Sequence, residues 1–219
     1  MRISLKHWLR LRRDPWRKVF YDAYKQWKRD KMEAKRYVFE GLGPDSVVFD
    51  VGGFEGNWAH DIHSRYGSTV HVFEPHPTFA AALVKRFENN PKIIVHDFAL
   101  GSEAGQLHLS DDGDASSAVN DVANAVTGEV RAVAGFMAEF EPPVIDLMKI
   151  NIEGGEYDLL PALAASGDLA RFGIVQVQFH QFRESDGALR DSVRADLAQT
   201  HTEAWCYPFV WEEWHRAQA

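Results

Sequence analysis

The sequence has almost no cysteine and no long hydrophobic run. Its 219 residues contain a single cysteine, Cys206, which excludes an internal disulfide framework and favours a reducing compartment. No apolar stretch approaches the roughly 20 residues needed to span a bilayer. The basic N-terminus has no uninterrupted apolar segment of the kind that marks a secretory signal. We therefore expect a cytoplasmic protein.

Charge is divided unevenly along the chain. Residues 1–36 hold 13 of the 24 Lys and Arg residues and 4 of the 32 Asp and Glu residues, a balance of +9. The remainder of the chain has a balance of −17. We divide the chain into a basic amphipathic helical segment, residues 1–36, and a domain that covers residues 37–219.

Apolar side chains of the basic segment recur at three- and four-residue spacing, and so share one helical face. They are Trp16, Val19, Phe20, Ala23, Tyr24 and Trp27. Such a helix can pack on the domain, where it could cover the ligand site, or lie on an anionic membrane surface. The second alternative would place the protein at the inner face of a membrane. The acidic body argues against a nucleic-acid partner.

Strand-like and helix-like segments alternate from residue 46 onward, which is typical of an α/β protein with a doubly wound parallel sheet. Residues 111–132 lack firm periodicity, and we expect a loop or lid there. The predicted strands are 47–51, 69–73, 92–96, 144–152 and 174–179, with an extra strand at 106–109 and closing strands within 204–214. The predicted helices are 57–66, 78–89, 159–165 and 189–199.

The first predicted strand ends at a glycine-rich turn that contains Asp50, Gly52, Gly53 and Gly56. Turns of this kind hold nucleotide-like ligands at the carboxyl edge of such a sheet. The carboxylate of Asp50 would repel a pyrophosphate, and the G-x-G-x-x-G pattern of dinucleotide-binding enzymes is absent. This disfavours a dehydrogenase. It favours a ligand with hydroxyl groups and a positive charge, such as S-adenosylmethionine (SAM).

The next strand ends reinforce this interpretation. Glu74 ends the second strand, at a distance where an acid can accept hydrogen bonds from ribose hydroxyls, and Pro75 stops that strand. Asp97, Phe98 and Ala99 follow the third strand, where a polar group and an aromatic ring could contact an adenine.

A second group of polar residues follows the later strands and predicts the site of the other substrate. Asn151 and Glu153 follow the fourth main strand, and His180 follows the fifth. His180 is the candidate general base, because imidazole titrates near neutral pH. Glu153 could orient His180, bind a hydroxyl or take the proton itself. A divalent metal held by Asn151 and Glu153 is possible but not favoured.

Five ordered blocks resemble the FkbM family of SAM-dependent methyltransferases over about residues 37–215. The blocks are Asp50–Asn57, Val72–Pro75, Ala99–Gly101, Asp146–Gly154 and Gln178–His180. The resemblance implies the class I methyltransferase fold, a mostly parallel seven-stranded sheet with an antiparallel last strand. It also implies SAM as cofactor and a hydroxyl of a sugar, glycan or related natural product as acceptor.

The residues that we assign to the cofactor combine this resemblance with the strand-end pattern. They are Asp50, Gly52, Gly53, Phe54, Gly56, Asn57, Glu74, Pro75, Asp97, Phe98 and Ala99. The chain departs from the family's usual pattern at two places: it has Gly53-Phe54 where the family usually has Ala-Asn, and Asn151 where the family usually has Asp. The second departure leaves open a non-catalytic or membrane-associated SAM- or glycan-binding protein of the same fold.

Overall fold

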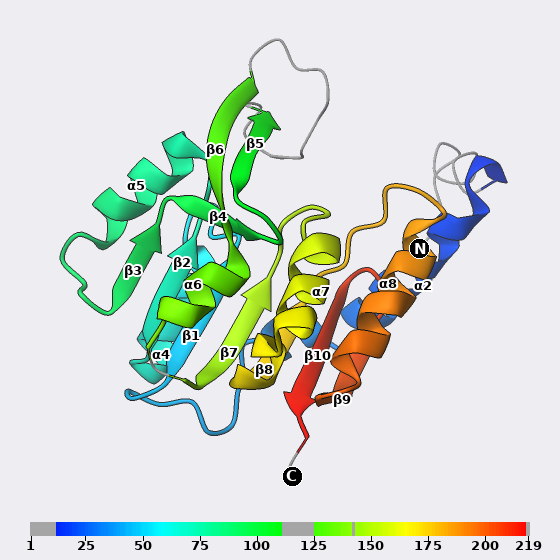
Figure 1. Ribbon diagram of the computed structural model, residues 1–219. Coiled ribbons are helices and arrows are strands. Elements are labelled where there is room, and N and C mark those ends of the chain that lie inside the picture. Colours follow the sequence, from blue (N-terminus) through cyan, green and yellow to red (C-terminus); the bar gives the residue numbers. More distant parts are fainter. Residues whose placement is uncertain (1–11, 111–124, 142, 218–219) are drawn as a thin grey trace.

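A central sheet of seven strands forms the body of the protein (Figure 1). The computed structural model describes residues 12–110, 125–141 and 143–217. Strand order in this sheet is β3-β2-β1-β7-β8-β10-β9, and only β10 runs antiparallel to its neighbours. The strands are β1 (Val47–Val51), β2 (Thr69–Phe73), β3 (Ile93–His96), β7 (Ile145–Ile150), β8 (Phe172–Val177), β9 (His201–Tyr207) and β10 (Trp211–Arg216). The predicted doubly wound sheet with an antiparallel last strand is confirmed.

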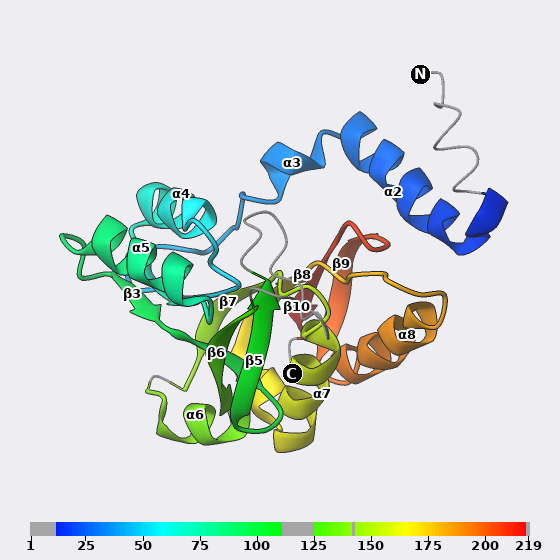
Figure 2. The same cartoon turned by 90° about the horizontal axis from the view of Figure 1, so that it is seen from above.

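Helices cover both faces of this sheet (Figure 2). One face carries α4 (Asn57–Tyr66) and α5 (Pro77–Phe87), together with the N-terminal helices α2 (Lys18–Arg29) and α3 (Met32–Lys35). The other face carries α6 (Val133–Glu139), α7 (Glu156–Ser166) and α8 (Asp186–Leu197). Two short 3₁₀ turns, Pro15–Arg17 and Asp168–Arg171, precede α2 and β8.

The alternation of side chains along β1 explains why both faces are covered. Val48 packs with α4 and α5 in one apolar cluster, whereas Phe49 and Val51 pack with α6 and α7 in another. Successive side chains of a strand point to opposite faces, so a strand that is apolar at both sets of positions must be buried on both sides. Because β1, β2, β7 and β8 run parallel, their carboxyl ends meet at one edge of the sheet.

A second, smaller sheet corrects the expectation of a loop over residues 111–132. Ala125–Ala132 forms strand β6, which pairs in parallel with β4 (Phe98–Gly101) and antiparallel with β5 (Gly105–Ser110). The predicted loop was wrong for residues 125–132, because pairing with two distant strands determines this structure and local composition does not. Residues 111–124 lie outside the described part of the chain.

Helix α2 packs on the closing strands of the main sheet. Trp27 is 3% exposed, and its ring centroid lies 5.3 Å from that of Tyr207 and 5.8 Å from that of Trp205. The Tyr207 hydroxyl donates a hydrogen bond to Asp30 at 2.8 Å. Val19 remains exposed on the same helix. Tyr24 is exposed as well, whereas Ala23 and Trp27 are buried, so only part of the apolar face of α2 packs on the domain.

Among the described residues, no helix combines the length and the apolar composition that crossing a bilayer requires.

Candidate functional site

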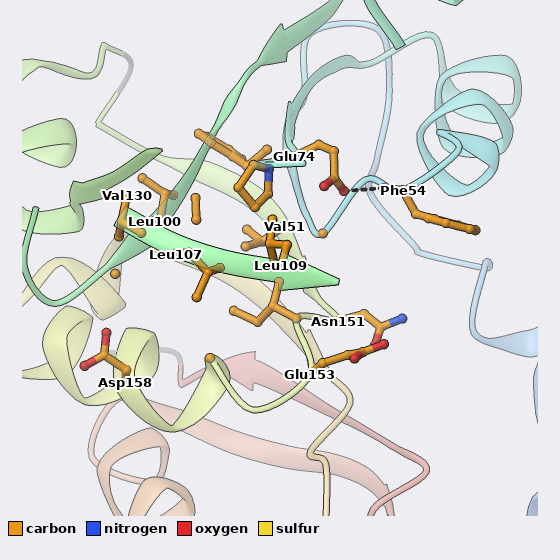
Figure 3. Close-up of a pocket in the computed structure, with 17 residues that line it drawn as sticks. Val51, Phe54, Glu74, Leu100, Leu107, Leu109, Val130, Asn151, Glu153 and Asp158 are labelled. Atoms are coloured by element: carbon orange, nitrogen blue, oxygen red, sulfur yellow. Dashed lines mark hydrogen bonds between the residues drawn. The ribbon is translucent and has the colours of Figure 1, made fainter. Parts of the chain in front are cut away.

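A cavity of about 430 Å³ opens at the carboxyl ends of β1, β2 and β7 (Figure 3). One wall comes from the strand ends themselves and the opposite wall from the small sheet, which contributes Leu107, Leu109 and Val130. The lining is mostly apolar. Its remaining members are Val51, Gly52, Phe54, Phe73, Glu74, Pro75, Ala99, Leu100, Gly101, Asn151, Ile152, Glu153, Gly155 and Asp158.

The glycine-rich turn after β1 is packed tightly against the chain itself. The amides of Gly52 and Gly53 both donate to the carbonyl of Phe73, at 3.0 and 3.2 Å. A Cβ on Gly52 would lie 2.1 Å from the carbonyl oxygen of Asn151, and one on Gly53 would lie 2.2 Å from a methyl group of Val72. Packing within the protein alone therefore requires glycine at these two positions, whether or not a ligand binds. Of the two, only Gly52 lines the cavity.

Phe54 adopts an unusual backbone conformation at the tip of this turn. Its φ of 49° lies in the left-handed region, where a bulky side chain is disfavoured and Asn is better tolerated. The ring is 40% exposed and packs edge-on against Phe79 with a centroid distance of 4.7 Å. The departure from the family's Asn thus replaces an amide with an apolar ring at the mouth of the cavity.

Asp50 lies beneath the turn and does not reach the cavity wall. Its carboxylate is fully buried and lies 2.8 Å from the Lys149 ammonium, which also donates to the carbonyl of Gly52 at 2.7 Å. Burial raises the pKa of Asp50, and the positive charge of Lys149 opposes this shift. The buried pair fixes the turn from below, so the structure gives Asp50 a supporting position in place of a direct contact.

Glu74 is one of three acids that line the cavity, and it follows β2. Its carboxylate accepts hydrogen bonds from the amides of Phe54 at 2.7 Å and His76 at 2.9 Å. Glu74 is 6% exposed, and burial raises its pKa. A carboxylate has about four acceptor sites, so capacity remains on the cavity side. Figure 3 shows this side chain at one end of the cavity.

Asn151 and Glu153 line the cavity after β7, where they lie beside each other (Figure 3). Glu153 has a left-handed φ of 48° and is followed by Gly154 at 106°. Burial raises the pKa of Glu153; the charge of His180 lowers it and that of Glu156 raises it further. A strained backbone at a carboxylate of this kind is a feature of functional sites.

His180 is held by a buried acid, Glu156, at the start of α7. The Glu156 carboxylate accepts from the His180 amide at 2.7 Å and lies 3.2 Å from the imidazole Nδ1. Its second oxygen accepts from the Gly154 amide at 2.8 Å. Tyr157 donates its hydroxyl to the His180 carbonyl at 2.7 Å. A carboxylate can only accept, so the ring nitrogen that faces Glu156 carries a proton, and in the neutral ring Nε2 would be the nitrogen with the free lone pair.

The predicted site residues separate into two sets. Gly52, Phe54, Glu74, Pro75, Ala99, Asn151 and Glu153 line the cavity together. The others lie outside its wall. Gly53 and Gly56 are packed against Val72 and Leu83, Asn57 bonds with Arg86, and Phe98 is buried in the core. Asp97 lines a neighbouring hollow whose wall also includes Pro75. His180 belongs to a second cavity.

Sequence reasoning gave no role to several residues that build the site. Glu156 follows the Asp146–Gly154 block by two residues, and its burial against His180 depends on how α7 meets the end of β8. Lys149 lies within that block, yet the sequence does not show that it pairs with Asp50. Leu107, Leu109 and Val130 enter the cavity only because the small sheet folds over it.

The described residues bring three potential metal ligands together at Glu203, Cys206 and Glu212. This group lies on β9 and β10, away from the cavity. Arg190 and Arg194 form ion pairs with Glu212, and Arg194 also pairs with Glu203. The acids of this group are thus already matched by two guanidinium groups.

The lining of the cavity fits SAM better than a pyrophosphate-bearing cofactor. Three carboxylates, Glu74, Glu153 and Asp158, line it, and none of its described lining residues is Lys or Arg. Phosphate groups would be repelled there, whereas a ligand with ribose hydroxyls and positive charges is accommodated. The apolar walls provide a surface for a purine ring.

Comparison with known proteins gives one family and one fold. The Methyltransferase FkbM domain matches residues 50–201. The hexuronic acid methyltransferase AglP of Haloferax volcanii is 22% identical over 152 residues, which are 68% of this chain and 63% of that relative. The chain therefore spans less than two thirds of the length of this relative.

Two solved structures share the fold. The FkbM methyltransferase from Methylobacillus flagellatus KT has a TM-score of 0.53 and 14% identity, over 80% of this chain and 44% of that chain. A methyltransferase from Streptococcus mutans in complex with SAH has a TM-score of 0.51 and 10% identity, over 84% and 96% of the two chains. At these identities the likeness concerns the fold alone.

Proposed function

Since the chain belongs to the FkbM methyltransferase family, we propose that it transfers a methyl group from SAM to a hydroxyl of a sugar, a glycan or a related natural product. The observation that carries this proposal is the buried Glu156 that orients His180 beside the Glu153 turn. A hydroxyl must lose its proton to become methylated, and an oriented imidazole with a free Nε2 is suited to accept it.

Glu74 would hold the cofactor at one end of the cavity. Its two backbone hydrogen bonds fix the carboxylate, so that its remaining lone pairs can accept from ribose hydroxyls without further reorganisation. Phe54, Pro75 and Leu109 would enclose the purine in apolar surface. When bound, SAM supplies a methyl group on a positively charged sulfur.

Asn151 and Glu153 would bind and position the acceptor where the two substrates meet. Their side chains line the cofactor cavity after β7. Glu156 and Tyr157 hold His180 from the other side of the turn, so that the base does not have to be ordered when the acceptor binds. Much of the catalysis would then come from positioning in a site that excludes water.

A sugar-related acceptor is supported by the relative from Haloferax volcanii, whose name describes methylation of a hexuronic acid. The test is to incubate the protein with SAM and a panel of glycosides and to measure S-adenosylhomocysteine release. Mass spectrometry would identify a product that has gained one methyl group. A protein that binds SAM but releases no S-adenosylhomocysteine with any hydroxylated acceptor would contradict the proposal.

The second candidate function is a non-catalytic protein that binds SAM or a glycan with the same cavities. It is favoured by Asn151, which replaces the family's usual Asp and cannot act as an anionic base. Acceptor-dependent release of S-adenosylhomocysteine would exclude it. Peripheral membrane contact through residues 1–36 is a separate proposal, and flotation with anionic vesicles, compared between the full chain and a chain that lacks residues 1–30, tests it.

A further inference from the structure

A second cavity, of about 310 Å³, lies between the N-terminal helical segment and the loop that follows β8. Trp16, Phe20 and Tyr21 line it from the N-terminal side, and His180, Gln181 and Phe182 line it from the loop. The cavity is at the lower end of the size range of small-ligand sites, about 300–1,000 Å³. It is large enough for one ring with its substituents.

This second cavity adjoins the turn that ends the cofactor cavity. A Cβ on Gly154 would lie 3.2 Å from the ring of Phe182. The imidazole of His180 stacks on the same ring with a centroid distance of 6.0 Å and an interplanar angle of 11°. The Glu153–Gly155 turn therefore borders both cavities, with the candidate base on the side of the second.

Two polar groups of this cavity lack the hydrogen bonds that burial demands. The side-chain oxygen of Gln181 is buried without a hydrogen-bond partner in the described part of the chain, and so is the Nε of Arg17. The carboxylate of Asp14 lies 3.5 Å from Arg17 Nε. Unsatisfied buried groups cost free energy and call for a partner. A ligand hydroxyl could donate to Gln181, and a ligand oxygen could accept from Arg17.

We propose that this cavity is the acceptor subsite and that it binds a single sugar ring, an inference that rests on the proposed function. Aromatic side chains offer flat apolar surface to the C–H faces of a ring, and the side-chain oxygen of Gln181 and the Nε of Arg17 offer hydrogen bonds to its hydroxyl groups. Helix α2 is then part of the active site. Its docking through Trp27 brings Trp16 and Arg17 to the loop after β8.

The test measures sugar binding without turnover. The protein is saturated with S-adenosylhomocysteine, and saturation-transfer NMR is recorded with methyl β-D-glucopyranoside and methyl β-D-glucuronopyranoside. We expect transfer to the ring protons in the wild type. Trp16→Ala and Gln181→Met should each weaken binding about five- to tenfold. Gln181→Met keeps the length of the side chain and lies on a different segment from α2, so it does not depend on how the helix folds.

The matched control is Val19→Ala, which changes an exposed side chain of α2 three residues after Trp16 and should bind like the wild type. Failure of both glycosides to show transfer would overturn the inference, as would binding that persists in both variants. Glycoside binding that the two variants weaken, without any methylation, would contradict the proposed function and leave the subsite standing. Methylation of a glycoside with an unchanged KM in both variants would support the proposed function and contradict the subsite.

Discussion

The site that we propose has a donor end and an acceptor end, and a carboxylate that accepts two backbone amides serves a different purpose at each. At the donor end, Glu74 accepts two backbone amides and still faces the cavity, with 6% of its surface exposed. At the acceptor end, Glu156 also accepts two backbone amides but is fully buried and touches the imidazole of His180. Glu74 is itself available to a ligand, whereas Glu156 is not and instead holds His180, which is.

The two ends also differ in how the chain assembles them. The strand ends of the donor side come from neighbouring segments, the turns after β1 and β2 with the start of the small sheet. The proposed acceptor side joins the N-terminal segment and the loop after β8, which line the second cavity, with the turn after β7, which lines the first. A contiguous motif can be identified in a sequence, but an assembled surface requires the tertiary structure. The comparison leads to four predictions that separate the two ends.

The largest effect is expected for the base. His180→Ala should lower kcat by about 10²–10⁴-fold, the usual contribution of a general base, while SAM affinity stays at the wild-type value. Steady-state kinetics and calorimetry measure the two quantities. A variant that turns over its acceptor at the wild-type rate would remove His180 from the mechanism.

The docking of α2 is tested by Trp27→Ala. Trp27 is almost fully buried against Trp205 and Tyr207, and replacing a buried Trp with Ala costs about 3–5 kcal/mol of stability. Denaturant unfolding should show this loss, and the KM for the acceptor should rise. Val19→Ala on the exposed side serves as the control. Unchanged stability would mean that α2 is not docked as described.

Glu156→Ala should have an intermediate effect. It leaves the amides of Gly154 and His180 without their acceptor, which costs about 1–3 kcal/mol for each buried group. We expect kcat to fall roughly tenfold or more, with SAM affinity unchanged, because the base loses its orientation. Partial rescue by Glu156→Gln, whose amide oxygen can still accept, would distinguish positioning from general unfolding.

The smallest effect concerns Glu153, whose pKa is raised by burial. A raised pKa means that the folded protein binds the proton more tightly than the unfolded chain. Ionisation therefore costs stability as pH rises through the folded pKa. Glu153→Gln should be slightly more stable than the wild type at pH 8, by less than the roughly 2–4 °C in Tm that 1 kcal/mol gives. This gain should vanish below the ordinary pKa of 4.5. Thermal scans at both pH values test the sign.

Much of the main sheet could be predicted from the sequence. β1, α4 and β2 begin and end at the predicted residues, because apolar runs bounded by glycine and proline carry strong local signals. β6 could not be predicted, since Gly128 and Glu129 interrupt its β-branched residues and the strand is ordered by pairing with β4 and β5. Likewise the sequence indicated Glu74, Asn151 and His180, but the partners of His180 and Asp50 follow from tertiary packing.

The most direct test of the account is the affinity for SAM, measured by calorimetry for the wild type, Glu74→Ala and His180→Ala side by side. We propose that Glu74 binds SAM and that His180 accepts the proton of the acceptor hydroxyl. We therefore predict that Glu74→Ala weakens SAM binding by about tenfold or more, as expected for the loss of charge-assisted hydrogen bonds, and that His180→Ala binds SAM like the wild type. Wild-type affinity in Glu74→Ala, or an equal loss in both variants, would contradict the account.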